Sequence, residues 1–304
     1  MKIYEYGVDA ILHIKRSVAL GFFDGVHLGH RKIIESAVSH SATLGATPSV
    51  FTFFGERGGF KSGAPRIYPT EKKLEILESL GIKEVVIADF SRVSSITAED
   101  FVRGVLTEDL SAVSVHLGYN YRFGSGGRGT AETLSHLFGG VTDILPEYRF
   151  GDGELSSTVI RKVLAVGDVT EAGKMLGAPY SITGQIVHGM GLGHSLGCPT
   201  VNIDLSPDCP LRHGVYSTTA KIGDNTYPAI TNIGVCPTVG ERDLHAETHL
   251  LGFSGEIYGE KCTIYFTKFI RDEMQFSSKE ELAGRIELDK KIALEEKNYV
   301  GNMD

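Results

Sequence analysis

A chain of 304 residues is long enough for two domains, or one large one, and its 41% hydrophobic and 22% charged residues are ordinary for a soluble globular protein. The formal net charge is −8 and no block rich in Lys and Arg appears, which argues against nucleic acid as the main partner. The sequence shows no signal peptide and no membrane-spanning run, so we expect a cytoplasmic protein without a membrane partner, and nothing indicates an oligomeric state.

The first expected strand leads into a pair of histidines. Val18 to Phe23 is an apolar run typical of a buried strand, Asp24-Gly25 ends it, and a helix is expected from near Leu28. His27 and His30 stand three residues apart, so both can face one side of the first helical turn. A helix start offers free backbone N–H groups and a positive dipole end, and two imidazoles there can donate hydrogen bonds to a triphosphate.

The residues around this pair favour a site over a plain surface turn. Gly29 removes a side chain where a nucleotide or a neighbouring strand would come close. A bare H-x-G-H is more often two surface histidines. The longer string, Gly21-x-Phe23-Asp24-Gly25-x-His27-x-Gly29-His30 between a strand and a helix, is far less common by chance.

Beyond this motif the first half alternates strands and helices. We expect helices over 31–44, 70–80, 97–110 and 130–138, and strands over 49–54, 84–88, 113–117 and 141–145. This rhythm is typical of an α/β fold with a doubly wound parallel sheet, which binds ligands at the carboxyl ends of its strands. The histidine motif follows one such end.

A loop rich in aromatic residues and glycine follows the strand at 113–117. In Gly118-Tyr-Asn-Tyr-Arg-Phe-Gly124, Tyr119 and Tyr121 can stack on a flat ring and Arg122 can meet a phosphate, although by itself an exposed aromatic loop is the simpler interpretation. The next stretch, Gly124-x-Gly126-x-x-Gly129, matches a dinucleotide fingerprint only formally, because it stands several residues after the strand. We expect a flexible glycine loop there.

Three hydroxyl residues, Ser156, Ser157 and Thr158, lead into a helix that extends to about residue 166. An ordinary N-cap explains one of them. All three together, with Arg161 one turn later on the same side, make a second candidate phosphate cradle.

The rhythm changes at Ala178-Pro179-Tyr180, after a short helix that ends near Gly177. Short β-rich runs broken by glycine and proline predict strands over 182–187, 201–203, 214–222, 227–233, 244–251 and 262–269, which is typical of a small antiparallel β-barrel. A charged amphipathic helix is expected from 277 to about 297. We therefore predict two domains, 1–178 and 179–304.

The two phosphate motifs, in this order, resemble those of the nucleotidyltransferase superfamily, and the first half is similar to the N-terminal half of the prokaryotic bifunctional riboflavin kinase/FMN adenylyltransferase family. The resemblance implies a nucleotidyltransferase-like fold and catalytic roles for His27 and His30. It implies ATP binding by Gly21, Phe23, Asp24, Gly29, Ser156, Ser157, Thr158 and Arg161, and flavin binding by Asn120, Tyr121 and Arg122. The sequence departs from the family in lacking a proline-histidine-proline element after the strand at 49–54, and in having Asn120 where an acidic residue is common.

Elements of the second half resemble riboflavin kinases. The glycine-rich turn at 189–197 implies ATP binding by Gly191 and Gly193, and Pro199-Thr200-Val201-Asn202 implies Mg²⁺ binding by Thr200 and Asn202. Glu247 aligns with the general base of the family, and the segment Asn232 to Val239 matches a further element. Arg271 and Glu273 lie in a segment that resembles the one that closes over the flavin in this family, which implies flavin binding by both. Leu192, His194 and Cys198 depart from the residues usual in the glycine turn.

These resemblances imply a bifunctional transferase that phosphorylates riboflavin to FMN with ATP and Mg²⁺ and adenylylates FMN to FAD with release of pyrophosphate. Its partners would be riboflavin, FMN and ATP. The alternatives are an enzyme that retains only one of the two activities and a non-catalytic flavin-binding regulatory paralogue. A nicotinamide dehydrogenase, suggested only by the glycine fingerprint, comes last.

Overall fold

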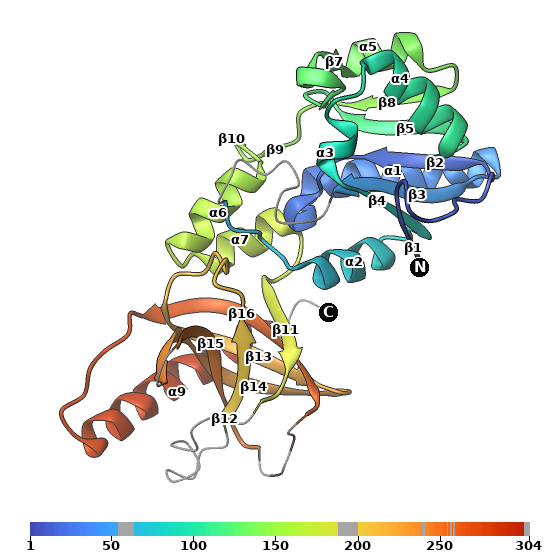
Figure 1. Cartoon of the computed structure of the whole chain (residues 1–304). Coiled ribbons are helices and arrows are strands. Elements are labelled where there is room, and N and C mark those ends of the chain that lie inside the picture. Colours follow the sequence, from blue (N-terminus) through green and yellow to red (C-terminus); the bar gives the residue numbers. More distant parts are fainter. Residues whose placement is uncertain are drawn as a thin grey trace. The chain divides into compact units, whose positions relative to one another are not determined.

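The structure is a computed structural model that describes residues 1–53, 64–187, 200–238, 241–253, 255, 257 and 259–300. It divides into two compact units, one made of residues 1–64 and 68–157 and the other of residues 65–67 and 158–304 (Figure 1). The domain boundary that the sequence predicts after residue 178 stays a prediction, since the helices between 158 and 177 group with the second unit by their contacts.

The first unit is built on a parallel sheet of six strands in the order β1-β4-β3-β2-β5-β8, which confirms the predicted doubly wound sheet. The strands are β1 (Lys2–Glu5), β2 (Arg16–Leu20), β3 (Thr47–Phe53), β4 (Glu84–Ala88), β5 (Ala112–Gly118) and β8 (Val141–Leu145). All five residues of β2 are buried, and it lies between β3 and β5. The histidine motif therefore starts from the middle of the sheet.

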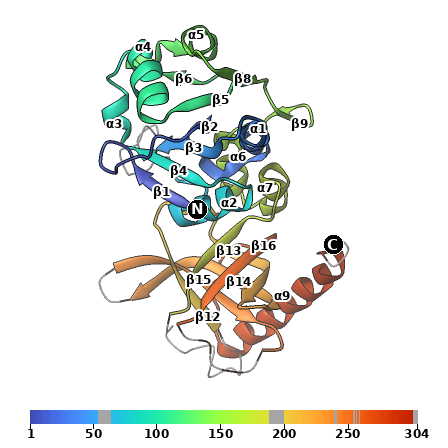
Figure 2. The same ribbon diagram turned by 90° about the vertical axis from the view of Figure 1, so that its right-hand side faces the viewer.

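Alternate residues of the central strands are buried on opposite faces of this sheet, because side chains along a strand point to the two faces in turn. Val18 and Leu20 belong to one hydrophobic cluster and Ala19 to the other. One cluster includes α1 (Leu28–Leu44) and α2 (Thr70–Ser79); the other includes the π-helix η2 (Phe101–Asp109) and α5 (Ala131–Leu137). Helices thus cover both faces, as Figures 1 and 2 show.

Short elements complete the first unit. They are η1 (Asp24–Val26), α3 (Phe90–Val93), α4 (Ala98–Asp100), η3 (Ser125–Gly127), and the hairpins β6 (Arg122–Phe123) with β7 (Gly129–Thr130) and β9 (Arg149–Phe150) with β10 (Gly153–Glu154). The glycine fingerprint at 124–129 falls on the first hairpin. A Cβ at Gly124 would lie 2.9 Å from the backbone N of Ala98, so close packing explains this glycine without a ligand.

The second unit begins with α6 (Ser157–Ala165) and α7 (Val169–Leu176) and continues as an antiparallel barrel. Its six strands have the order β11-β16-β13-β14-β15-β12, and a bridge between Val187 and Asn202 connects the two outer strands, so the barrel is nearly closed. The strands are β11 (Ser181–Gln185), β12 (Thr200–Leu205), β13 (Gly214–Ile222), β14 (Asn225–Thr238), β15 (Glu241–Leu250) and β16 (Lys261–Arg271). The final helix, α9 (Lys279–Val300), packs on β13, β14 and β16.

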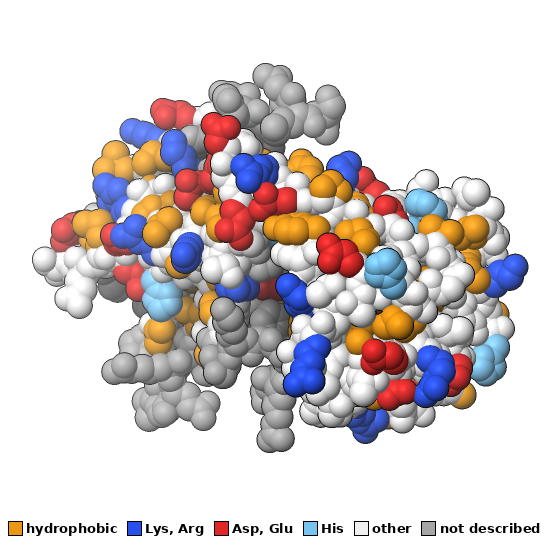
Figure 3. Space-filling model, turned by 90° about the horizontal axis from the view of Figure 1, so that it is seen from above, with side chains coloured by type: hydrophobic (Ala, Val, Ile, Leu, Met, Phe, Trp, Pro, Cys, Tyr) orange, Lys and Arg blue, Asp and Glu red, His pale blue; other side chains and the backbone are white. Residues whose placement is uncertain are grey.

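Charged side chains of both signs are mixed over the face seen in Figure 3. None of the helices in the described part of the chain is both long and apolar enough to cross a membrane.

Candidate active sites

The turn between β2 and α1 has an unusual backbone that the sequence did not reveal. The expected strand ends at Leu20, three residues early, and Phe23 and Val26 adopt positive φ angles of 52° and 44°, which are rare for residues with side chains. The Phe23 ring is fully buried and lies within 3.2 Å of where a Cβ of Gly21 would stand. Such strain persists only where the surroundings enforce it, and it is common at functional sites.

This turn places His27 and His30 against each other. Their rings stack with centroids 3.7 Å apart, and the Phe23 ring meets His30 edge-on at 5.3 Å. His27 is the N-cap of α1, because its Nδ1 accepts a hydrogen bond from the backbone N–H of His30 at 3.4 Å. A Cβ at Gly29 would lie 3.3 Å from the His27 ring and from the Cβ of Tyr148, so a side chain there would press on both.

Both histidines are neutral near pH 7. Burial lowers the pKa of His27 to about 4. Burial also lowers the pKa of His30 well below its ordinary value, and the charges of His27 and Lys73 lower it further. The His30 Nδ1 is buried and has no hydrogen-bond partner in the described part of the chain. A buried polar atom without a partner is costly, so this nitrogen is suited to a ligand oxygen.

Lys73 is a buried cation behind the same turn, and its place in the site is not predicted from the sequence. Its Nζ donates hydrogen bonds to the backbone O of Phe22 and, at 3.0 Å, to Oγ1 of Thr52. The residue lies on α2, whose alternation of charged and apolar residues predicts only an ordinary amphipathic helix.

A cavity of about 660 Å³ opens beside the histidines. It brings together most of the site residues that the sequence predicts for the first half: Gly21, Phe23, His27, Gly29, His30, Asn120, Tyr121, Arg122, Ser156 and Ser157. Burial raises the pKa of the Tyr121 hydroxyl, and its ring stacks on Phe123 with centroids 6.0 Å apart. The volume lies within the range of small-molecule sites, which is about 300–1,000 Å³.

The predicted hydroxyl cradle is divided between the two units. Ser157 Oγ donates a hydrogen bond to the backbone O of Asp24 at 2.9 Å. This bond uses the Ser157 proton and stabilises the turn between β2 and α1. Thr158 and Arg161 fall in the second unit, where Nη2 of Arg161 donates to Oγ1 of Thr158 at 3.2 Å. Their approach to the histidines stays a prediction.

In the barrel, the register of three strands places Glu247 between two asparagines. On β15, Glu247 lies opposite Asn202 of β12 on one side and opposite Asn232 of β14 on the other. Thr200 lies opposite His249 in the same way. Since paired residues of antiparallel strands share a face, these side chains form two adjacent rows on one face.

A second cavity, of about 290 Å³, opens over these rows, although Asn202 is not among the residues that line it. Thr200, Asn232, Glu247 and His249 line it from the strands, and residues 271–276 and α9 line it from the other side. The carboxylate of Glu247 is exposed within this cavity, and desolvation by the walls raises its pKa above the ordinary value. A raised pKa makes a carboxylate a stronger proton acceptor.

Arg271 and Glu273 both line this cavity. Arg271 donates from Nε and Nη2 to Oδ2 of Asp289 on α9, at 3.0 and 2.8 Å. Asp289 is 1% exposed and also lies 3.2 Å from Nε of Arg285. Asp289 is not predicted from the sequence, because a charged helix is usually solvated. Glu273 packs against Gly234, where a Cβ would clash with its carboxylate.

Three predicted features lie outside the described residues: the glycine turn with Gly191 and Gly193, the departures at Leu192, His194 and Cys198, and most of the loop at 55–66. Cys209 and Cys262 are free thiols in the described part of the chain.

Comparisons with known proteins match both halves of the chain. A family model described as FAD synthetase matches residues 10–159, and one described as riboflavin kinase matches residues 176–296. A bifunctional riboflavin kinase/FMN adenylyltransferase of Bacillus subtilis (strain 168) is 33% identical, covering 95% of this chain and 94% of that protein. One from Pseudomonas fluorescens is 31% identical over 89% of each chain.

A solved structure agrees with the fold. A protein from Streptococcus pneumoniae, described as a macrolide-efflux protein, superposes with a TM-score of 0.83 at 30% identity, covering 93% of this chain and 95% of that one. On the two family models and on relatives at 31–33% identity over most of the length, the chain belongs to the bifunctional riboflavin kinase/FMN adenylyltransferase family.

Proposed function

We propose that the chain makes flavin nucleotides in two steps, one in each unit. The barrel transfers the γ-phosphoryl group of ATP to riboflavin and gives FMN and ADP. The parallel-sheet unit joins FMN to the AMP part of a second ATP and gives FAD and pyrophosphate. The observation that carries this proposal is that each unit contains its own cavity lined by the motif residues of the matching family.

In the first unit, the histidine pair would bind and stabilise the phosphates of ATP. The negative charge of a polyphosphate raises the pKa of nearby imidazoles, so His27 and His30 become better donors once ATP is bound. The partnerless Nδ1 of His30 supports this role. As the FMN phosphate oxygen bonds to the α-phosphorus and the bond to pyrophosphate breaks, the negative charge that moves to the leaving group is stabilised by these donors.

The flavin would lie in the same cavity. Asn120, Tyr121 and Arg122 line it beside the histidines, which supports the flavin-binding role that the family resemblance implies. Gly21, Phe23, Asp24 and Gly29 would shape the nucleotide side, and Ser156, Ser157, Thr158 and Arg161 would complete the phosphate site.

In the barrel, Glu247 would act as the general base. Its carboxylate takes the proton of the ribityl 5′-hydroxyl while that oxygen bonds to the γ-phosphorus and ADP leaves. The raised pKa of Glu247 and its place in the wall of the cavity support this role. Arg271 and Glu273, on the opposite wall, would contact the flavin.

The residues on β12 fit the Mg²⁺ that the family implies. Thr200 and Asn202 offer neutral oxygens on one face of the strand, two residues apart and in register with His249 and Glu247. Such hard oxygen donors, few in number, suit an ion that also binds substrate phosphates. When bound, Mg²⁺ would neutralise phosphate charge. Gly191 and Gly193 would contact the same phosphates, and a cytoplasmic location stays a prediction from the sequence.

Two incubations test the proposal, with the flavins resolved by chromatography. Riboflavin with ATP and Mg²⁺ should yield FMN, and FMN with ATP and Mg²⁺ should yield FAD. His30→Ala should abolish FAD formation and leave the conversion of riboflavin to FMN intact. Equal loss of both products in this variant would contradict the two-site arrangement. If the unaltered chain forms neither product, a non-catalytic flavin-binding paralogue becomes the better interpretation.

A further inference from the structure

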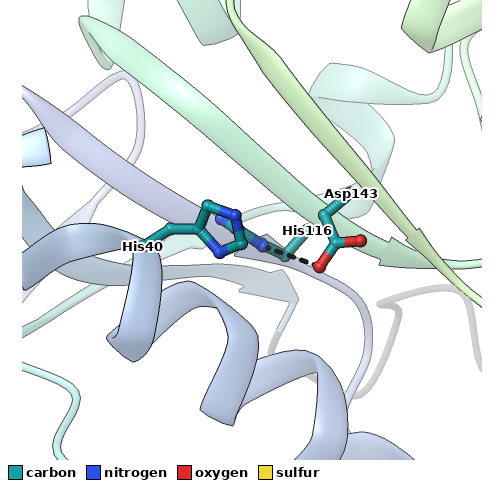
Figure 4. Close-up of side chains that lie close together, drawn as sticks. All are labelled: His40, His116 and Asp143. Atoms are coloured by element: carbon teal, nitrogen blue, oxygen red, sulfur yellow. Dashed lines mark ion pairs between the residues drawn. The ribbon is translucent and has the colours of Figure 1, made fainter. Parts of the chain in front are cut away.

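Away from both candidate active sites, two histidines and an aspartate converge between helix α1 and the sheet (Figure 4). His40 comes from α1, His116 from β5 and Asp143 from β8, where it lies directly opposite His116. One nitrogen of each histidine and one carboxylate oxygen lie within 4.8 Å of one another. His116 is fully buried, whereas His40 and Asp143 are half-buried.

The hydrogen bonds of two serines favour a proton on Nε2 of His116. Ser17 Oγ lies 2.8 Å from the backbone O of Ala37, to which it can only donate, and 2.9 Å from Nε2 of His116. When its one proton goes to Ala37, Ser17 accepts a proton from Nε2. Ser114 donates to Ser17 at 2.7 Å and lies 3.1 Å from the same nitrogen, which agrees with this assignment. In neutral His116, the lone pair is then on Nδ1, which faces Asp143 at 3.6 Å.

His40 is assigned in the same way. Its Nδ1 lies 3.0 Å from the backbone O of Ser36, and a carbonyl oxygen can only accept, so Nδ1 carries the proton. The lone pair of neutral His40 is on Nε2. Histidines that bind metals show this arrangement, in which one nitrogen donates to a carbonyl or another protein acceptor and the other is available to the metal.

When Nδ1 of His116 carries the lone pair, the centre of the cluster has one hydrogen-bond donor fewer than it has acceptors. Ser36 Oγ lies 2.9 Å from Nδ1 of His116 and in hydrogen-bond contact with Oδ2 of Asp143, but it has only one proton for these two acceptors.

We propose that His40, His116 and Asp143 form a binding site for a divalent transition metal ion such as Zn²⁺. Two imidazole nitrogens and one carboxylate oxygen are a common three-residue set for this ion, and Ser36 Oγ or a water molecule would be the fourth ligand. Imidazole ligands favour Zn²⁺ over Mg²⁺, which separates this site from the phosphate chemistry of the barrel.

Binding requires only small movements. Ligand atoms about 2.1 Å from a tetrahedral ion lie roughly 3.4 Å apart, so the half-buried side chains of His40 and Asp143 would move inward by about 1 Å. The ion would link α1, the helix that begins at the histidine turn, to strands β5 and β8. It would therefore stabilise the first unit by binding to its folded form.

The experiment measures Zn²⁺ binding to the full chain by equilibrium dialysis and by competition with a chromogenic chelator. The variants His40→Gln and Asp143→Asn remove one ligand each from half-buried positions and should leave the fold unchanged by circular dichroism. His136→Gln, at an exposed histidine of α5, is the matched control, and His30→Gln reports on ion binding at the nucleotide site.

One equivalent of Zn²⁺ should bind to the unaltered chain, to His136→Gln and to His30→Gln. His40→Gln and Asp143→Asn should bind this equivalent at least about 100-fold more weakly. Zn²⁺ should also raise the melting temperature of the first three proteins and not of the last two. Equal binding by the unaltered chain and His40→Gln would overturn the site. A Zn²⁺ equivalent that is lost only in His30→Gln would also overturn the site, because the ion would then bind at the nucleotide site.

Discussion

The buried Asp289 allows a test of whether the contact between Asp289 and Arg271 shapes the barrel cavity. Its carboxylate holds the Arg271 guanidinium at the cavity wall by accepting hydrogen bonds from Nε and Nη2, and the side chain of Arg271 is 13% exposed. We expect Asp289→Ala to release Arg271 from this orientation. The variant should lose both stability of the second unit and affinity for riboflavin, because the contact between Asp289 and Arg271 stabilises the fold and also orients Arg271 in the cavity.

The structure sets the size of the effect. Removing one partner of a buried ion pair costs about 3–5 kcal/mol, because the other charge is left buried. Arg271 keeps its bond to the backbone O of Asp272 at 3.0 Å, and the Arg285 side chain is 31% exposed, so water can reach part of the uncompensated charge. We therefore expect the low end, about 3 kcal/mol. The loss of one charge-assisted contact to the flavin should raise the KM for riboflavin about tenfold.

Urea unfolding followed by circular dichroism measures the first quantity, and initial rates of FMN formation measure the second. The control is Glu287→Gln, which removes an exposed carboxylate of the same helix that forms an ion pair with Lys290, and it should change neither value. FAD formation from supplied FMN should stay constant in both variants. If Asp289→Ala unfolds at the same urea concentration as the control and keeps the KM for riboflavin, Asp289 does not position Arg271.

Three further changes test the two sites. Gly29→Ala should slow FAD formation, because its Cβ would press on the His27 ring and Tyr148 at 3.3 Å, whereas Gly104→Ala, with no atom within 4 Å, should not; equal rates would refute the tight fit. Glu247→Gln should lower the kcat of FMN formation about 10²–10⁴-fold with FAD formation from FMN unchanged, and a normal rate would place the base elsewhere. Stability should fall as the pH drops from about 6.5 to about 4, because folded His27, with a pKa of about 4, binds its proton later than the unfolded chain does. The contribution of His27 to this fall in the free energy of unfolding approaches about 3 kcal/mol. The urea midpoints of His27→Gln should therefore change less with pH between about 6.5 and about 4.

The sequence predicted the architecture well because buried residues in this chain recur at the spacings typical of strands and helices. Strands β4, β8 and β13 have the predicted bounds, α5 differs by one residue at each end, and α7 ends at Leu176, next to the predicted end near Gly177. Strand β1 was missed, since its four residues are mostly exposed and carry no alternating pattern. The expected α-helix at 97–110 is largely the π-helix η2, which follows the short helix α4 with its N-cap at Thr97. Propensity and capping indicate a helix but do not distinguish hydrogen bonds to the fourth residue from those to the fifth.

The parts of the sites that escaped prediction are charged residues whose burial depends on the rest of the fold. Lys73 and Asp289 both lie on helices among other charged residues, where a solvated face is the normal outcome. Their neighbours in sequence do not distinguish them; what differs is that Lys73 meets the backbone of Phe22 and Asp289 meets Arg271, 51 and 18 residues away. A buried charge is stable only with such a partner, so it marks a position where two distant segments are fixed relative to each other. Phe22, Arg271 and Asp289 all line a cavity, which is why the Asp289 variant should affect substrate affinity and stability together.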